Sequence, residues 1–207
     1  MKPFPVGVLV SGSGTNLQAI INAQEKGDLP ISIQVVISNK ESAYALERAK
    51  NHGIPSFYIS HKQYESREKF DQAMHEVLVA HGVELIVLAG FMRLVSPWFV
   101  TQWKMKIINT HPALVPSFPG VHAAKQALEY GVKITGCSVF FVDDGVDTGP
   151  VIIQAAVPVL SEDTEDSLQA RIQVQEHQIL PQAIHWIANK ELKVEGRKII
   201  TPPILHR

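Results

Sequence analysis

The chain has 207 residues, 45% of them apolar and 19% charged, and its 19 basic and 20 acidic side chains leave a net charge of −1. This length can bury the core of one α/β domain, and the composition is typical of a globular protein. The balanced charge excludes a general nucleic-acid binder, because no basic excess is present to neutralise phosphates. Since no apolar run reaches membrane-spanning length and the N-terminus lacks an apolar signal core, we expect a cytoplasmic protein without a membrane partner.

Short β-branched runs alternate along the chain with longer stretches of helical periodicity. In the first half of the chain we predict strands at residues 6–10, 31–38 and 84–88, with a short extended piece at 56–59. The helices between them are predicted at 16–26, at 43–51, and through 70–78, where Gly82 ends the helix. In the second half we predict a short helix capped by Ser96 and Pro97, a strand at 106–109, a helix at 122–130 stopped by Gly131, strands at 135–142 and 151–157, a long helix from about Thr164, and a short strand from about residue 193. Only residues 143–150 separate the last two long strands, so these should form an antiparallel hairpin. The predicted fold is α/β: a Rossmann-like, open, mostly parallel twisted sheet with helices on both faces and the hairpin at one end.

The segment Asn109-Thr110-His111-Pro112 follows an apolar run and begins a proline-rich loop. If the strand continues, Asn109 and His111 share a face, because side chains two residues apart point to the same side. Open α/β sheets bind ligands at the carboxyl ends of their strands. An amide donor beside a titratable imidazole suits chemistry on a carbonyl group, although a histidine after a strand is more often a loop residue or a hydrogen-bonded filler.

A glycine-rich loop, Ser11-Gly12-Ser13-Gly14-Thr15-Asn16, joins the first predicted strand to the first helix. Its glycines allow close approach of a ligand, and the helix N-terminus offers N–H groups with partial positive charge. The loop matches neither the dinucleotide fingerprint nor the Walker motif. It predicts a site for a single phosphate, with an ordinary tight strand-to-helix turn as the alternative.

Residues 143–150 form an acidic turn, Asp-Asp-Gly-Val-Asp-Thr-Gly-Pro, for which solvated carboxylates are the usual explanation. An EF-type calcium loop would need further ligands and a terminal Glu that are absent here. Alternatively Asp147 faces His111, where a carboxylate would favour the protonated imidazole and make it a general acid. The single cysteine, Cys137, lies in a strand-like run and is expected to be a buried filler rather than a nucleophile.

Taken together, these motifs resemble the phosphoribosylglycinamide formyltransferase family, a folate-dependent branch of the formyltransferase superfamily. The resemblance runs from Val6 to about Asn189. It rests on the glycine loop, Ala89-Gly-Phe-Met-Arg-Leu94, Ile108-Asn-Thr-His-Pro-Ala-Leu-Val-Pro116, Gly120-Val-His-Ala123, Asp147-Thr-Gly-Pro-Val-Ile152 and Gln173-Val-Gln-Glu-His177.

The resemblance implies transfer of a formyl group from 10-formyltetrahydrofolate to the amine of glycinamide ribonucleotide in de novo purine (IMP) biosynthesis, without a metal. Asn109 and protonated His111 would stabilise the tetrahedral oxyanion, and Asp147 would keep the imidazole charged and oriented. By the same resemblance, the substrate phosphate, ribose and amine would contact Gly14, Thr15, Asn16, Gln173 and Glu176. The folate would contact Arg67, Met92, Arg93, Leu94, Val95, Asp143, Asp144, Gly145 and Val146. For Arg67 the alternative is a solvated helix start, and for Met92 it is core packing.

The same resemblance implies one domain, residues 1–207, with a phosphate-binding half to about residue 100 and a folate-binding and catalytic half beyond it, working as a monomer or homodimer. Many relatives carry His where this chain has Phe140, Ser at Ala113, and Lys or Tyr at Ser117 and Phe118. The nearest alternative is a 10-formyltetrahydrofolate hydrolase, whose relatives usually carry an extra N-terminal domain. An initiator-tRNA formyltransferase would add a C-terminal domain and a basic surface. A non-catalytic folate or nucleotide-binding module would not require Asn109, His111 and Asp147 together.

Overall fold

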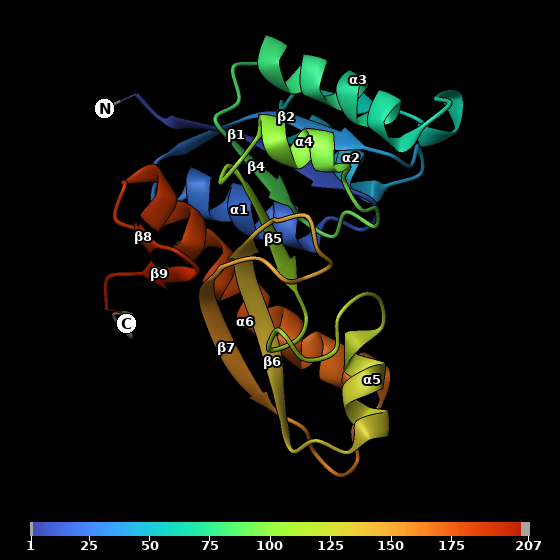
Figure 1. Ribbon diagram of the computed structural model, residues 1–207, viewed down its shortest axis with the longest axis vertical. Coiled ribbons are helices and arrows are strands. Elements are labelled where there is room, and N and C mark those ends of the chain that lie inside the picture. The colour runs from blue at the N-terminus through green and yellow to red at the C-terminus, as the bar shows by residue number, and fades with distance from the viewer. Residues whose placement is uncertain (1, 204–207) are drawn as a thin grey trace. The chain divides into compact units, whose positions relative to one another are not determined.

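The computed structural model describes residues 2–203 (Figure 1). Its main sheet has seven strands in the order β3-β2-β1-β4-β5-β6-β7, and a second sheet pairs β8 with β9. The chain divides into two compact units, Met1–Asn109 and Thr110–Arg207, which are described separately below. The predicted α/β class, the mostly parallel sheet and the antiparallel hairpin are confirmed. Within the described residues, none of the helices combines the length and apolar character that a membrane crossing requires.

In unit 1, every pair of adjacent strands is parallel, from the edge strand β3 through to β5. The strands are β1 (Phe4–Val10), β2 (Ile31–Ser38), β3 (Ser56–Tyr58), β4 (Leu85–Leu88) and the first part of β5 (Ile107–His111). The helices are α1 (Thr15–Glu25), α2 (Tyr44–Asn51), the short η1 (His61–Gln63), α3 (Arg67–Ala80) and α4 (Pro97–Gln102). Figure 1 shows α3 and α4 on one side of these strands and α1 on the other. Because helices cover both faces of the sheet, both faces of β1 and β4 are buried, and these strands show no alternation of apolar and polar side chains.

The strand order of unit 1 places β1 between β2 and β4, so the direction of the connections reverses between β1 and β4. Ligands of open α/β sheets bind outside the carboxyl ends of the strands at such a reversal. The loops that follow β1 and β4 begin at Ser11 and Ala89, and these are the glycine loop and the segment with the family-like Ala-Gly-Phe-Met-Arg-Leu sequence. These two motifs are far apart in the sequence, but both lie at the carboxyl ends of neighbouring strands, β1 and β4.

The strand β5 begins and ends later than predicted, at Ile107 and His111 instead of residues 106 and 109. Met105, just before it, has a left-handed backbone with φ 57°, which ends the preceding turn and delays the strand. The strand consequently contains both Asn109 and His111. Their side chains share a face of β5, and Thr110 points to the opposite face.

Unit 2 is built on the hairpin of β6 (Ile134–Phe141) and β7 (Val151–Pro158), with the helices α5 (Ala123–Tyr130) and α6 (Glu165–Ala188). The long helix α6 packs against both strands and against α5. Gly131 ends α5 with φ 80°, as predicted. The single strand expected from residue 193 is in fact a small hairpin of β8 (Lys193–Glu195) and β9 (Lys198–Ile200).

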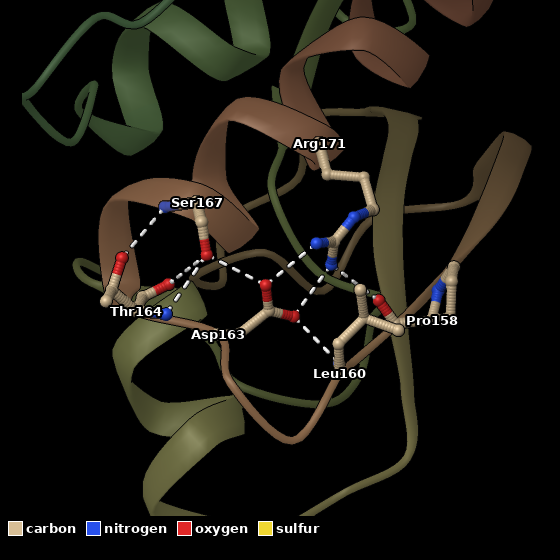
Figure 2. Close-up of polar contacts among 6 residues, drawn as sticks. All are labelled: Pro158, Leu160, Asp163, Thr164, Ser167 and Arg171. Atoms are coloured by element: carbon tan, nitrogen blue, oxygen red, sulfur yellow. Dashed lines mark hydrogen bonds and ion pairs between the residues drawn. The ribbon is translucent and has the colours of Figure 1, made fainter.

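The start of α6 is fastened to the end of β7 by the side chain of Asp163 (Figure 2). Its two carboxylate oxygens accept hydrogen bonds from both terminal nitrogens of Arg171, each at 2.7 Å. The carboxylate also accepts from the Leu160 N–H at 2.7 Å and the Ser167 hydroxyl at 2.8 Å, while Arg171 donates to the Pro158 carbonyl. A capping box of Thr164 and Ser167 completes the turn. These hydrogen bonds fix the N-terminus of α6, the helix that also carries Gln173 and Glu176.

Candidate active site

The side chains of His111 and Asp147 meet in unit 2. Nδ1 of His111 lies 3.4 Å from Oδ2 of Asp147, and both side chains are largely buried, at 5% and 11% exposed. His111 ends β5, whereas Asp147 belongs to the turn between β6 and β7. This distance is that of an ion pair, and contacts of this kind are often long before substrates bind. The structure thus brings together two of the three residues expected to be catalytic, and the third, Asn109, is two positions away in β5.

A loop of unit 2 engages both members of this pair through its backbone. Nε2 of His111 lies 2.8 Å from the carbonyl oxygen of Phe118. The N–H of Gly120 donates to Oδ2 of Asp147 at 2.8 Å. A carbonyl oxygen can only accept, so Nε2 must carry a proton. The other ring nitrogen, Nδ1, faces the Asp147 carboxylate.

The backbone of this loop is held in uncommon conformations. Phe118 and His122 have φ of 51° and 58°, and Gly120 has φ 83°. Asp147, which receives the Gly120 N–H, also lies in the left-handed region at φ 53°. Asp adopts this region more readily than most residues. Backbone of this kind persists only where the surrounding contacts impose it, and it is frequent at functional sites.

The other residues of the acidic turn differ from Asp147 in their surroundings. Oδ1 of Asp143 accepts from the Gly145 N–H at 3.1 Å and from the Thr148 hydroxyl at 2.6 Å, which closes the turn on itself. Asp144, Gly145 and Val146 are exposed. Asp143 therefore closes the turn, Asp147 faces His111, and the residues between Asp143 and Asp147 are exposed.

In unit 1, the glycine loop is fastened to α2. The Ala45 N–H donates to the Gly12 carbonyl at 3.1 Å, and Nε of Arg48 donates to the Ser13 carbonyl at 2.8 Å. Gly14, at φ 72°, caps α1, and a Cβ added there would lie 2.6 Å from Cβ of Ala45. Gly14 is thus required by backbone conformation and by close packing, independently of any phosphate.

The first turn of α1 contains Thr15 and Asn16, so the helix begins one residue before the predicted start. No acidic side chain occupies this turn, and no side chain caps it. Asn16 is only 8% exposed, and its Oδ1 atom is buried without a hydrogen-bond partner among residues 2–203. Buried polar atoms are nearly always paired, so an unpaired one beside a helix N-terminus indicates a place for a ligand.

Ser11 links the glycine loop to the segment after β4. Its hydroxyl donates to Oδ1 of Asn39 at 2.6 Å and accepts from the Met92 N–H at 2.8 Å, while its own N–H donates to the Gly90 carbonyl. The side chains of Met92 and Leu94 are 62% and 55% exposed. Core packing, considered as an alternative for Met92, is therefore wrong. The backbone at Met92 is anchored and its side chain is open to a ligand.

The two arginines assigned to the folate lie close enough to the buried Asp71 of α3 for their charges to act on its carboxylate. Burial raises the pKa of Asp71, whereas hydrogen bonds from Ser96 and the charges of Arg67 and Arg93 act against this rise. Arg93 stacks over the Phe70 ring with its Cζ 5.6 Å from the ring centroid, and its buried Nε has no partner among residues 2–203. Arg67 is exposed at the first position of α3, which Ser66 caps. Val95, two residues after Arg93, is half-buried.

Gln173 and Glu176 lie three residues apart on α6, Gln173 half-buried and Glu176 buried. Oε1 of Glu176 accepts a hydrogen bond from the Thr110 hydroxyl at 3.0 Å. Burial, together with the negative charge of Glu176, raises the pKa of the Cys137 thiol to about 12. Cys137 is fully buried, which confirms that it fills space in β6. Within residues 2–203, no three His, Cys, Asp or Glu side chains are grouped as metal ligands would be.

Comparison with known proteins decides the family. A family model described as Formyl transferase matches residues 5–184. The chain belongs to the formyl transferase family. This formyl transferase is 44% identical to the phosphoribosylglycinamide formyltransferase of Escherichia coli (strain K12) over 187 residues, which are 90% of this chain and 88% of that protein. It also matches the crystal structure of glycinamide ribonucleotide transformylase 1 from Symbiobacterium toebii, with a TM-score of 0.95, 48% identity, and coverage of 97% and 94% of the two chains.

Longer proteins also contain a region similar to this formyl transferase. The trifunctional purine biosynthetic protein adenosine-3 of Drosophila melanogaster is 48% identical over 201 residues. These residues are 96% of this chain and only 14% of that protein. The resemblance inferred from the sequence motifs is confirmed.

Proposed function

We propose that this protein transfers the formyl group of 10-formyltetrahydrofolate to the amine of N1-(5-phosphoribosyl)glycinamide in de novo purine (IMP) biosynthesis. The products are the N-formyl ribonucleotide and tetrahydrofolate. The observation that supports this most strongly is the His111–Asp147 pair at 3.4 Å, on a strand that also carries Asn109, in a chain similar to phosphoribosylglycinamide formyltransferase over 90% of its length.

The glycine loop is proposed to hold the substrate phosphate. Gly14 begins α1, whose N-terminus favours an anion, and Thr15 and Asn16 add side-chain groups within the first turn. The unpaired Oδ1 of Asn16 would gain a hydrogen-bond donor when a ligand with hydroxyl groups, such as a ribose phosphate, binds. Leaving such an atom unpaired costs about 1–3 kcal/mol, so its pairing would favour binding.

The chemical step is attack of the amine nitrogen on the formyl carbon. A C–N bond forms, the formyl oxygen gains negative charge, and the bond from carbon to N10 of the folate then breaks. One proton leaves the amine and one must reach N10. Asn109 and the protonated imidazole of His111 would donate hydrogen bonds to the oxyanion, and removing one such donor typically lowers the rate by about 10²–10³.

The proposed role of Asp147 is to hold His111 in its protonated form and fixed orientation. Before substrates bind, the Nε2–H of His111 donates to Phe118. We propose that the formyl oxygen replaces this carbonyl oxygen, so the loop at Phe118 must shift when the substrates bind. The exchange of one oxygen acceptor for another would keep the buried N–H paired throughout.

Gln173 and Glu176 are proposed to contact the ribose and amine end of the ribonucleotide, since both lie on one face of α6. The exposed side chains of Met92 and Leu94, with Arg93 and Val95, would border the pterin, and Arg67 would meet the folate carboxylates. The backbone of residues 143–146 would contact the pterin edge.

We further propose that residues 1–207 work as one formyltransferase domain in the cytoplasm, with small-molecule substrates and without nucleic acid, as a monomer or homodimer. The single cysteine, which forms no disulfide, fits a reducing compartment.

Comparing formyl transfer with formate release tests this function. The purified protein is incubated with 10-formyltetrahydrofolate, with and without N1-(5-phosphoribosyl)glycinamide, and both the formylated ribonucleotide and formate are measured. We expect consumption of the folate to depend on the ribonucleotide. Formate release at the same rate without the amine would instead support the hydrolase.

A further inference from the structure

Thr110 lies between the two residues of β5 that carry the proposed oxyanion donors, and its side chain points to the opposite face of the strand. Its hydroxyl donates to Oε1 of Glu176 at 3.0 Å. Thr110 is 6% exposed and Glu176 is 4% exposed, so this hydrogen bond is shielded from water. Thr110 therefore ties the strand that ends in His111 directly to α6.

The Glu176 carboxylate is an unusual group for such a position. The helix α6 packs against β6 and β7, and the charge of Glu176 is felt by Cys137 in the middle of β6. A buried carboxylate is unfavourable unless hydrogen-bond donors compensate it, and apolar side chains often stabilise such a position better. We therefore attribute the presence of the Glu176 carboxylate at this position to ligand binding rather than to the stability of the fold.

We propose that Thr110 is a positioning residue for ribonucleotide binding: its hydroxyl fixes the Glu176 carboxylate in the orientation that receives the substrate. The proposal rests on the function proposed above. One oxygen of the carboxylate is held by the strand that also carries Asn109 and His111. The group that binds the acceptor and the groups that stabilise the oxyanion are thus connected through a single residue, and misplacement by about 1 Å in such an arrangement can reduce the rate about 100-fold.

Four variants separate this role from a structural one. Thr110→Val keeps the size and removes the hydroxyl, Thr110→Ser keeps the hydroxyl, Glu176→Gln removes the charge, and the fourth combines Thr110→Val with Glu176→Gln. For each we would measure kcat, the KM for each substrate, the Kd for the ribonucleotide by calorimetry, and the midpoint of urea unfolding.

We expect Thr110→Val to raise the KM and Kd for the ribonucleotide about ten-fold, because hydrogen bonds to charged groups are the stronger ones. The KM for 10-formyltetrahydrofolate should stay near the wild-type value. Thr110→Ser should restore ribonucleotide binding. Thr110→Val should add little to the effect of Glu176→Gln, since its partner charge is already gone.

Three results would overturn the proposal. The first is a wild-type Kd for the ribonucleotide in Thr110→Val, and the second is failure of Thr110→Ser to restore ribonucleotide binding. The third is that Thr110→Val weakens the binding of both substrates equally and lowers the urea midpoint to a matching extent. Failure of the function itself looks different. In that case the wild-type protein would not formylate the ribonucleotide, whereas an error confined to Thr110 leaves wild-type transfer intact.

Discussion

The backbone carbonyl oxygen of Phe118 lies 2.8 Å from Nε2 of His111 and accepts the hydrogen bond that we propose the formyl oxygen receives during catalysis. The opposite ring nitrogen faces Asp147, which is itself bound by the Gly120 N–H. One short loop thus contacts both members of the pair, in a backbone conformation that includes three positive φ angles, at Phe118, Gly120 and His122. If the formyl oxygen replaces the Phe118 carbonyl oxygen, as we propose, substrate binding is coupled to the position of this loop.

The first prediction concerns this loop. In a crystal structure with the ribonucleotide and a folate analogue bound, the distance from His111 Nε2 to the Phe118 carbonyl oxygen should exceed hydrogen-bonding range. The imidazole should then face the position of the formyl oxygen. Persistence of the His111–Phe118 hydrogen bond with both ligands in place would show that His111 does not donate to the substrate through Nε2.

The second prediction compares two glycines of the same loop. Gly14→Ala would bring its Cβ within 2.6 Å of Cβ of Ala45 at φ 72°, whereas a Cβ at Gly12 meets nothing within 4 Å. We expect Gly14→Ala to lower the free energy of unfolding by about 1–3 kcal/mol and to weaken ribonucleotide binding. Gly12→Ala should change the free energy of unfolding by less than about 0.5 kcal/mol. Urea unfolding measures both, and equal stability of the two variants would contradict the packing argument.

The third prediction concerns the fastening of α6. Hydrogen bonds from Arg171 and the Leu160 N–H hold the pKa of Asp163 well below its usual value. A lowered folded-state pKa means that the carboxylate stabilises the fold above the unfolded-state pKa of about 4 and that this contribution is lost as the pH falls through the folded-state pKa.

Asp163→Asn should therefore lower the melting temperature at pH 7, and the difference from wild-type should shrink progressively below about pH 4. Thermal unfolding from pH 7 to pH 2.5 measures this. Asp166→Asn, at the second position of α6, is a suitable control, because it removes a negative charge from the same helix N-terminus without breaking the Asp163–Arg171 ion pair. A difference that is constant over this pH range would mean that the Asp163 ion pair is not the cause.

The fourth prediction concerns the thiol of Cys137. Burial and the charge of Glu176 raise its pKa to about 12, so the thiolate that reacts with alkylating agents is scarce at neutral pH. Native protein at pH 8 should resist iodoacetamide, whereas protein in 6 M urea should react at once. Rapid labelling of the native protein, followed by mass spectrometry, would show that this part of β6 opens to solvent.

The fold was predictable where hydrophobic patterning and turn chemistry agree. The strand β2 was predicted at its observed bounds because an apolar, β-branched run lies between Pro30 and Asn39. The cap Ser96 was predicted because Ser followed by Pro is typical of a helix start, and its side chain accepts the Phe99 N–H. The start of α6 near Thr164 was also predicted, whereas the capping box that Thr164 forms with Ser167 was not. The start of β5 was missed, since an apolar Met105 gives no indication of its positive φ.

The candidate site was predictable only through side chains whose chemistry is visible in the sequence. Asn109, His111 and Asp147 could be named for that reason, and the family resemblance supplied their roles. The Phe118 carbonyl and the Gly120 N–H are backbone groups, so residue identity could not reveal them. The contact of Gly14 with Ala45 and the hydrogen bond of Thr110 to Glu176 join segments distant in sequence, and periodicity within one element carries no information on such pairs.

The most direct test of the account is kcat for Asp147→Asn with both substrates saturating. Asn keeps the size of the side chain and tolerates the left-handed backbone at φ 53°, so the fold should be preserved. We predict a fall in kcat of about 10²–10⁴, with the urea midpoint near that of wild-type. A kcat close to the wild-type value would contradict the central claim that Asp147 maintains His111 as the protonated donor in formyl transfer.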